Sequence, residues 1–147
     1  MGEQISTPMK KALRFLAISL LLFNGVGAVI GGWILMIDPS GVQMQLPLDY
    51  LAHIPFRDYF IPGLILFVAN GLMSFVVLVA TATNGRFYTQ MLVVQGAILS
   101  GWIMIQIVMV QDVYYLHYIM ESVGLALMGL GFILYIKDHQ SQYKHSR

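Results

Sequence analysis

The 147-residue chain contains no cysteine, and only 10% of its residues are charged. Without cysteine it can form no disulfide, no thiolate metal site and no cysteine-based redox relay. A soluble domain usually has about a quarter of its residues charged, whereas 58% of this chain is hydrophobic. The shortage of charge therefore predicts that lipid, and not water, surrounds most of the protein.

The few charges are nearly balanced, with 8 Lys+Arg against 7 Asp+Glu. No basic stripe interleaves with aromatic residues, so nucleic acid is not expected as a partner. The chain also lacks a GxSxG nucleophile elbow and a glycine-rich phosphate loop. These absences favour a protein that is not an enzyme, and no residue pattern specifies a cofactor.

Four apolar runs divide the chain, and Glu121 is their one charged residue; the runs are residues 15–37, 61–82, 91–110 and 116–136. Each is close to the roughly 20 residues that a helix needs to cross about 30 Å of hydrocarbon. The runs do not alternate with period 2, and a spanning segment must satisfy its own backbone groups. The sequence predicts an all-α fold, a bundle of four transmembrane helices in one domain over residues 1–147.

The segment between the first two runs, residues 38–60, is more than a linker. It holds apolar and aromatic side chains between Pro39, Pro47 and Pro55. Such a stretch is typical of a loop that lies at the membrane interface or caps a bundle. We predict a short interfacial helix at 48–54 within this loop, and a polar tail at 137–147.

Basic residues in short loops predict the orientation of the helices. Seven of the 8 Lys+Arg fall on one side of the predicted membrane, and Arg57 falls on the other. We therefore expect a multi-pass protein of the inner (plasma) membrane with both termini in the cytoplasm and the loop 38–60 facing outward. The seven residues are Lys10, Lys11, Arg14, Arg86, Lys137, Lys144 and Arg147.

Small residues recur four positions apart within the runs. Gly27 and Gly31 form one such pair, and Ala97 and Gly101 form another. This spacing lets helix backbones approach closely in lipid, where apolar side chains gain little from association. The pairs are explained by packing within the bundle, or by an interface with a second copy of the chain or another membrane protein.

Uncharged polar residues also lie within the runs. Gln95, Trp102 and Gln106 share one face of the third predicted helix, because they are spaced by seven and eleven residues. Asn24 and Asn70 lie within the first and second. An amide in hydrocarbon needs partners, so these side chains should face the bundle interior. They either hold helices together or line a polar cavity for a ligand.

Glu121 is the strongest candidate for a functional group, because an ionisable residue inside a span is a functional candidate by default. His117 lies one turn before it on the same face. Three interpretations compete: a structural carboxyl, a proton- or solute-handling site, and a metal site. The metal site would use His53, Asp49, His117 and Glu121, although their spacing matches no metal-binding signature.

Short motifs in the loop resemble a group of small uncharacterised bacterial four-span membrane proteins. They are DPSG at 38–41, LPL at 46–48, PFRDY at 55–59 and IPGL at 61–64. The resemblance implies a bacterial inner-membrane protein and no particular activity. The layout of four short-looped helices is also similar to the DoxX-like superfamily, some of whose members are linked to quinone-dependent redox chemistry. No redox residue can be carried over from that likeness.

Three functions remain open on the sequence alone. The first is a non-enzymatic accessory or interaction protein of the membrane. The second is a small transporter or a membrane protein that binds lipid, quinone or another ligand at a site near Glu121. The third is a membrane enzyme linked to quinone or lipid. A bundle closed by its own side chains favours the first function, and a pocket that reaches Glu121 from outside or from lipid favours the second or the third.

The orientation can be tested with reporter fusions. Reporters fused at Arg86 and after Lys137 should report the cytoplasm, and a reporter at Gln45 should report the outside, because basic residues are retained on the cytoplasmic side. The measurement is paired phosphatase and fluorescent-protein activity in cells. A cytoplasmic signal at Gln45 would overturn the predicted orientation.

Overall fold

Among residues 7–145, four helices are long and apolar enough to cross a membrane, as the sequence predicts. The computed structural model describes the backbone of residues 7–145 and the side chains of residues 8–140. The first, third and fourth spans are continuous α-helices: α1 (Thr7–Ile37), α4 (Tyr88–Val110) and α5 (Tyr115–His145). The second span is made of three segments in sequence: α2 (Phe60–Ile65), η3 (Leu66–Leu72) and α3 (Met73–Ala82).

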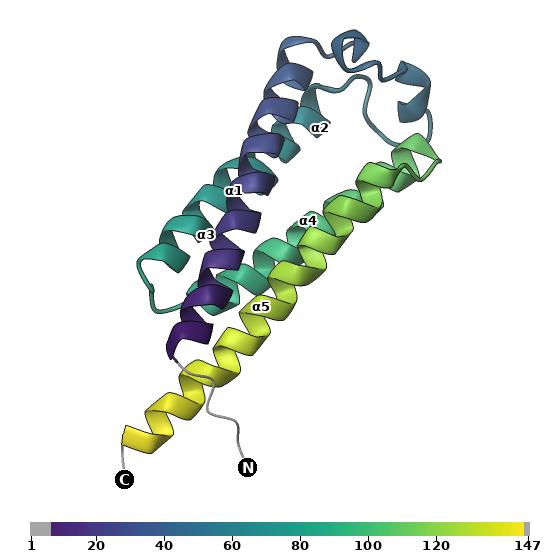
Figure 1. Cartoon of the computed structure of the whole chain (residues 1–147). Coiled ribbons are helices and arrows are strands. Elements are labelled where there is room, and N and C mark those ends of the chain that lie inside the picture. Colours follow the sequence, from purple (N-terminus) through teal and green to yellow (C-terminus); the bar gives the residue numbers. More distant parts are fainter. Residues whose placement is uncertain (1–6, 146–147) are drawn as a thin grey trace.

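The helices run alternately up and down, so α1 begins and α5 ends at the same end of the bundle (Figure 1). We call this end the termini end, and the opposite end, with residues 38–59 and the turn 111–114, the loop end. The helices form two close pairs, α1 with the second span and α4 with α5. Fewer contacts join one pair to the other.

Glycines bring α1 and the second span into backbone contact. A Cβ atom on Gly32 would lie 2.7 Å from both the Gly63 carbonyl oxygen and the Phe67 nitrogen. A Cβ on Gly71 would lie 3.1 Å from the Val29 nitrogen. No side chain larger than hydrogen fits at Gly32, so this contact fixes how closely the two helices approach.

The α4–α5 pair is built in the same way. A Cβ atom on Gly96 would lie 2.5 Å from the Gly124 carbonyl oxygen, and one on Gly124 would lie 2.6 Å from Ser100 Oγ. Nearer the termini end, a Cβ on Gly131 would lie 2.7 Å from the Thr89 carbonyl oxygen. The contacts set an antiparallel register in which α4 residues near 100 lie level with α5 residues near 122.

Polar side chains join the helices at the termini end. The Arg14 guanidinium donates to the carbonyl oxygens of Thr81 and Ala82 at 2.6 and 3.1 Å, and so satisfies backbone groups exposed where α3 ends. The Tyr88 hydroxyl donates to Asp138 Oδ2 at 2.9 Å, and Lys10 forms an ion pair with Asp138 Oδ1. These bonds connect α1 with α3, and α1 and α4 with α5.

The loop of residues 38–59 folds over the loop end. The Tyr59 ring is 2% exposed, and its hydroxyl donates to the Pro47 carbonyl oxygen at 2.7 Å; burial raises the pKa of this phenol. Gly41 has φ 75°, and a Cβ there would lie 2.5 Å from the Leu46 carbonyl oxygen. Only glycine fits this position without strain, so the loop depends on Gly41 and Tyr59.

Asp38 holds the start of the same loop. Its carboxylate accepts hydrogen bonds from the Ser40 hydroxyl and from the backbone N–H of Gln43, the latter at 2.8 Å. The Ser40 bond, followed by the Gln43 bond, holds the pKa of Asp38 below its usual value. The loop packs Leu51 and Tyr59 against Leu35 of α1 and Met109 of α4. It therefore bridges the two helix pairs as a cap.

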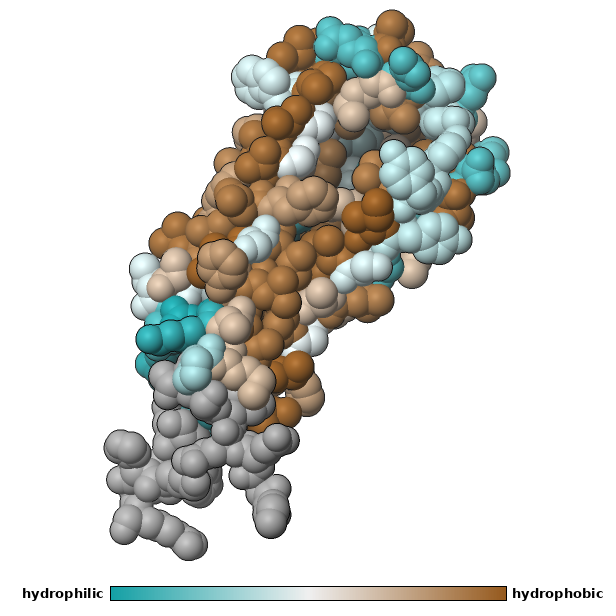
Figure 2. All heavy atoms as spheres, viewed as in Figure 1, coloured by the Kyte–Doolittle hydropathy of each residue, from teal (hydrophilic) through white to brown (hydrophobic). Residues whose placement is uncertain are grey.

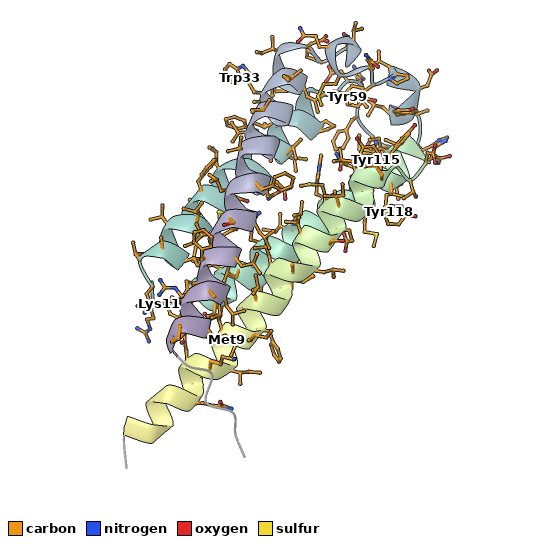
Figure 3. The ribbon with its side chains drawn as sticks, in the orientation of Figure 1. Met9, Lys11, Trp33, Tyr59, Tyr115 and Tyr118 are labelled. Carbon is orange, nitrogen blue, oxygen red and sulfur yellow. The ribbon has the colours of Figure 1, made fainter. Side chains whose placement is uncertain are left out.

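Apolar side chains cover the outside of the bundle between its two ends. Phe15, Val79, Val108 and Phe132 each expose more than half of their surface. On the face shown in Figure 2, hydrophobic atoms follow the length of the bundle, and hydrophilic atoms gather towards its ends. Trp33, Tyr115 and Tyr118 lie towards the loop end (Figure 3), where interfacial aromatic residues are typical of membrane proteins. The fold is that of a multi-pass helical membrane protein.

The structure departs from the sequence predictions in three places. The predicted helix at 48–54 is a single 3₁₀ turn, η2 (Leu48–Leu51), because Pro55 and the bend before it leave no room for a longer helix. Helix α5 continues to His145, so most of the predicted tail is helical. The π-helical segment η3 was not predicted. The side chains of Lys144 and Arg147, used to predict orientation, lie outside the described residues.

The glycine contact leads to a matched pair of substitutions. Gly32→Ala should lower the free energy of unfolding by about 1–3 kcal/mol, because the added methyl group overlaps backbone atoms of the second span. Gly27→Ala should be neutral or stabilising by up to about 1 kcal/mol, since a Cβ there meets no atom within 4 Å. Thermal unfolding in one detergent compares the two, and equal losses would contradict the packing.

Candidate functional site

A cluster of polar side chains lies in the middle of the bundle. Asn24, Asn70, Ser74 and Gln95, which we call the amide cluster, are each 0–1% exposed. The Asn24 amide donates to the Asn70 carbonyl oxygen at 3.3 Å and to Ser74 Oγ at 2.9 Å. Gln95 Nε2 donates to the Ala69 carbonyl oxygen at 3.2 Å. The cluster thus brings together α1, the second span and α4, as the sequence predicts for Asn24, Asn70 and Gln95.

The π-helical segment η3 explains why these amides meet the backbone. A π-helix forms i→i+5 bonds and is rare, and it often occurs at functional sites. Ala69 and Asn70 lie within this segment, and their two adjacent carbonyl oxygens accept the bonds from Gln95 and Asn24. The π-helical segment therefore carries two carbonyl oxygens that accept hydrogen bonds from other helices in the middle of a span.

Several atoms of the amide cluster have no hydrogen-bond partner. Both side-chain polar atoms of Asn70 are buried and unpartnered, and so are Asn24 Oδ1 and Gln95 Oε1. A buried polar group without a partner costs about 1–3 kcal/mol, and such groups are rare in folded proteins. Asn70 is the extreme case, because its whole amide is buried at 0% exposure without a bond. These atoms are the strongest indication of a ligand in the described residues.

A second polar group lies nearer the loop end, on α4 and α5. It consists of Trp102, Gln106, His117 and Glu121, and we call it the loop-end polar group. Trp102 Nε1 and Glu121 Oε2 are both buried without a partner. Their helices pack antiparallel, and the contact of Gly124 with Ser100 places Trp102 and Glu121 at nearly the same level. Gln106 is half-buried on the same face of α4.

The bonds of His117 identify its tautomer. Its Nδ1 accepts a hydrogen bond from the backbone N–H of Tyr114 at 3.0 Å, and the ring is 8% exposed. An accepting Nδ1 carries no proton, so in the neutral ring Nε2 is the N–H donor. The tautomer is inferred from this bond. His117 lies in the first turn of α5. One of its ring nitrogens is bonded to the turn before the helix, and the other is able to donate.

The two groups lie at different depths. At 1.5 Å per residue, Glu121 is about 9 Å from the start of α5 and Trp102 about 12 Å from the end of α4. Asn70 is about 15 Å from the loop-end limit of the second span, near its middle. Because Gln106, Trp102 and Gln95 share one face of α4, they form a polar series from the loop end to the amide cluster.

The four residues proposed as metal ligands do not assemble a site. Asp49 and His53 are exposed on the loop, whereas His117 is buried against the turn and Glu121 lies within α5. Within the described residues, no group of three or more His, Cys, Asp or Glu side chains converges as a metal site requires. The metal hypothesis therefore receives no geometric support.

Two serine hydroxyls lie with the polar side chains of the bundle, and the sequence analysis did not predict them as site residues. Ser74 accepts the bond from Asn24, and Ser100 Oγ is buried without a partner beside Gly124. Ser74 lies four residues after Asn70, and Ser100 lies among small residues of the third run. The spacing of Asn70 and Ser74 on one helix face was the available signal, because polar residues one turn apart within an apolar run share an environment.

The chain matches no protein family, no curated protein and no solved structure. The resemblance of the loop motifs to bacterial four-span membrane proteins therefore stays a prediction. Function has to be argued from the amide cluster and the loop-end polar group themselves.

Glu121 and Arg14 offer a comparison between an unpartnered and a bonded polar side chain. Glu121→Gln should change the free energy of unfolding by less than about 1 kcal/mol, because the amide keeps the shape and Oε2 has no bond to lose. Arg14→Gln should cost about 1.5–3 kcal/mol, since the charged donor to Thr81 and Ala82 is removed. Thermal unfolding measures both, and a larger loss for Glu121→Gln would mark Glu121 as structural.

Proposed function

We propose that the protein is a non-enzymatic membrane protein that binds a small, uncharged polar solute at the amide cluster. The main observation in support of this proposal is the Asn70 side-chain amide. It is 0% exposed, and neither of its polar atoms has a hydrogen-bond partner. A ligand that both donates and accepts hydrogen bonds would satisfy Asn70 together with Asn24 Oδ1 and Gln95 Oε1. The gain from those bonds supports binding, because each atom otherwise carries a desolvation cost.

The chemistry of the cluster favours an uncharged ligand. Its members are amides and a hydroxyl, and they carry no formal charge. A charged solute in the middle of a span would need a counter-charge, since an isolated charge in hydrocarbon is costly. Glu121, the one acid inside an apolar run, lies nearer the loop end. Neutral hydrogen-bonding groups such as hydroxyls, amides or ureas match the cluster.

The polar series on α4 supports an approach from the loop end. Gln106, Trp102 and Gln95 follow one face of that helix towards the amide cluster, and Trp102 Nε1 and Glu121 Oε2 supply one donor and one acceptor along it. The loop of residues 38–59 covers this end and contacts Met109 at the end of α4. Movement of the loop would expose this series of polar residues to the outside. In this proposal Glu121 positions the solute as it enters.

The proposal places the protein in a bacterial inner membrane with its termini in the cytoplasm. Lys10, Lys11, Arg14 and Arg86 lie at the termini end, as Lys137 does. Retention of basic loops in the cytoplasm supports this orientation. The loop end then faces outward, and the solute is taken from that side.

A second candidate is an accessory protein that associates with another membrane protein or a second copy of the chain. It is favoured by small residues that remain open: a Cβ on Gly27, Gly101 or Gly129 meets no atom within 4 Å. Ala97 is also exposed on α4, whereas Gly31 packs against Leu66 at 3.5 Å. Of the two predicted small-residue faces, the one with Ala97 and Gly101 is therefore free for a partner helix.

Solute binding can be tested on two asparagines. Asn70→Leu should abolish retention of the co-purifying solute while the solute-free protein keeps its thermal stability, because no bond within the protein is lost. Asn24→Leu should lower the free energy of unfolding by about 1–2 kcal/mol, since two interhelical bonds are lost. The measurements are mass spectrometry of small molecules released from the purified protein and thermal unfolding before and after release.

The same measurements on the wild-type protein distinguish the two candidate functions. Release of one small neutral molecule that Asn70→Leu lacks supports solute binding. A wild-type protein that releases no such molecule contradicts it. If that empty protein is also isolated as a dimer or with another membrane protein, the accessory role is supported instead.

A further inference from the structure

A polar pocket of about 520 Å³ opens at the termini end of the bundle, far from the amide cluster. Residues of α1, the turn 83–87, α4 and α5 surround it, so all but the second span contribute a helix. The pocket lies where the apolar spans end and the basic residues begin, which is the level of lipid headgroups if the helices cross a bilayer. The lining includes Lys10, Asn84, Arg86, Gln90, Asp138 and His139.

The charges of the pocket leave an excess of positive charge. Asp138 is engaged on both oxygens, by the Lys10 ion pair and by the Tyr88 hydroxyl. Arg86 is exposed, and its guanidinium lies over the Phe87 ring at 5.1 Å; among residues 8–140 it forms no ion pair. An anion at the pocket would meet Arg86 without displacing an existing partner, and the Phe87 ring limits the freedom of the guanidinium.

Neutral donors stand beside Arg86. The Thr89 hydroxyl donates to Gln90 Oε1 at 2.9 Å, which leaves the Gln90 NH₂ group as a donor. Asn84, in the turn before α4, lines the same pocket. The first turn of α4 also lacks a side-chain cap, so its dipole adds to the attraction for negative charge. A phosphate group, with several acceptor oxygens, matches a guanidinium flanked by amide donors.

A stripe of exposed residues continues from Gln90, in the pocket lining, along α4. Gln90, Val94, Ala97 and Gly101 follow each other by four, three and four residues, so they form one stripe on the helix. All four are exposed, and a Cβ on Gly101 would meet no atom within 4 Å. Because Ala97 and Gly101 are small, few side-chain atoms project from this part of the stripe. Its length and apolar character suit a hydrocarbon chain that extends into the membrane from a headgroup.

We propose that the pocket at the termini end binds the headgroup of an anionic phospholipid, with one acyl chain lying along the α4 stripe of Val94, Ala97 and Gly101. Arg86 pairs with the phosphodiester, and Asn84 and Gln90 donate hydrogen bonds to the headgroup. The ligand is a lipid and not free phosphate, because the pocket and the stripe are continuous and lie at the membrane boundary. This proposal does not rest on the binding of a solute at the amide cluster.

Lipid binding is measured by native mass spectrometry of the purified full chain in detergent, titrated with phosphatidylglycerol or with phosphatidylcholine of the same acyl chains. The wild-type protein should prefer phosphatidylglycerol. Arg86→Gln should weaken phosphatidylglycerol about fivefold, as expected for one basic residue near an anionic surface. It should weaken phosphatidylcholine less, because the choline cation offsets the charge of that lipid's phosphodiester. Gln90→Glu, which adds a negative charge to the pocket, should weaken phosphatidylglycerol further.

Lys11→Gln is the matched control, because Lys11 is an exposed cation at the same end that does not line the pocket. It projects from α1 on the side away from α5 (Figure 3), and its loss should leave both affinities unchanged. Gly101→Leu should weaken both lipids equally, since it fills the stripe. Equal affinities for the two lipids, an equal loss for Lys11→Gln, or displacement of phosphatidylglycerol by equimolar inorganic phosphate would each overturn the proposal.

Discussion

The backbone contact between α1 and the second span at Gly32 and Gly63 is the constraint on which the rest of the structure depends. In lipid, apolar side chains gain little by leaving their solvent for each other, so helix association relies on close packing and polar bonds. A Cβ on Gly32 would lie 2.7 Å from backbone atoms of the partner. The glycines thus set the spacing within this pair, and Gly96 and Gly124 do the same for α4 and α5.

Glycine contacts hold the helices together within each of the two pairs. Longer polar side chains connect one pair with the other. Gln95 of α4 reaches the Ala69 carbonyl oxygen of the second span, and so connects the pairs at mid-depth. That acceptor lies within the π-helical segment, and the side-chain amide of the next residue, Asn70, has no hydrogen-bond partner. A bundle selected only for stability has no use for an unbonded amide at this depth. The unmet hydrogen-bonding capacity is therefore an argument for a ligand.

The sequence was sufficient for the four spans and for the inward direction of Asn24, Asn70 and Gln95, because helix length and the cost of an amide in lipid are properties of residue type. It could not reveal the π-helical segment, since residues 66–72 read as an ordinary apolar helix around one asparagine. It also did not show which glycines make the internal contact. Gly27 and Gly31 fit the familiar spacing, yet Gly25 and Gly32 approach the second span more closely.

Which polar atoms are bonded was also beyond the sequence. Asn24 and Asn70 are the same residue type at similar depth, but Asn24 donates two bonds and Asn70 none. The difference arises from the position of each asparagine Cβ relative to the carbonyl groups of the neighbouring helix. This position depends on the distance between the helices, which the glycines set. A pattern of residue types can place an amide inside a bundle, whereas only the packed geometry separates a structural amide from one available to a ligand.

The separation of charge from neutral polarity gives the two proposed sites different chemistry on one helix. Gln95 and Trp102 lie on the inner face of α4, and Ala97 and Gly101 lie on its exposed face. Apart from Glu121, formal charge stays near the ends, where water or headgroups reduce its cost, and neutral amides occupy the middle. A lipid on the exposed face would press on the same helix that holds the Gln95–Ala69 bond. Any shift of α4 caused by lipid would change the amide cluster, and linkage requires the solute to change lipid affinity by the same factor.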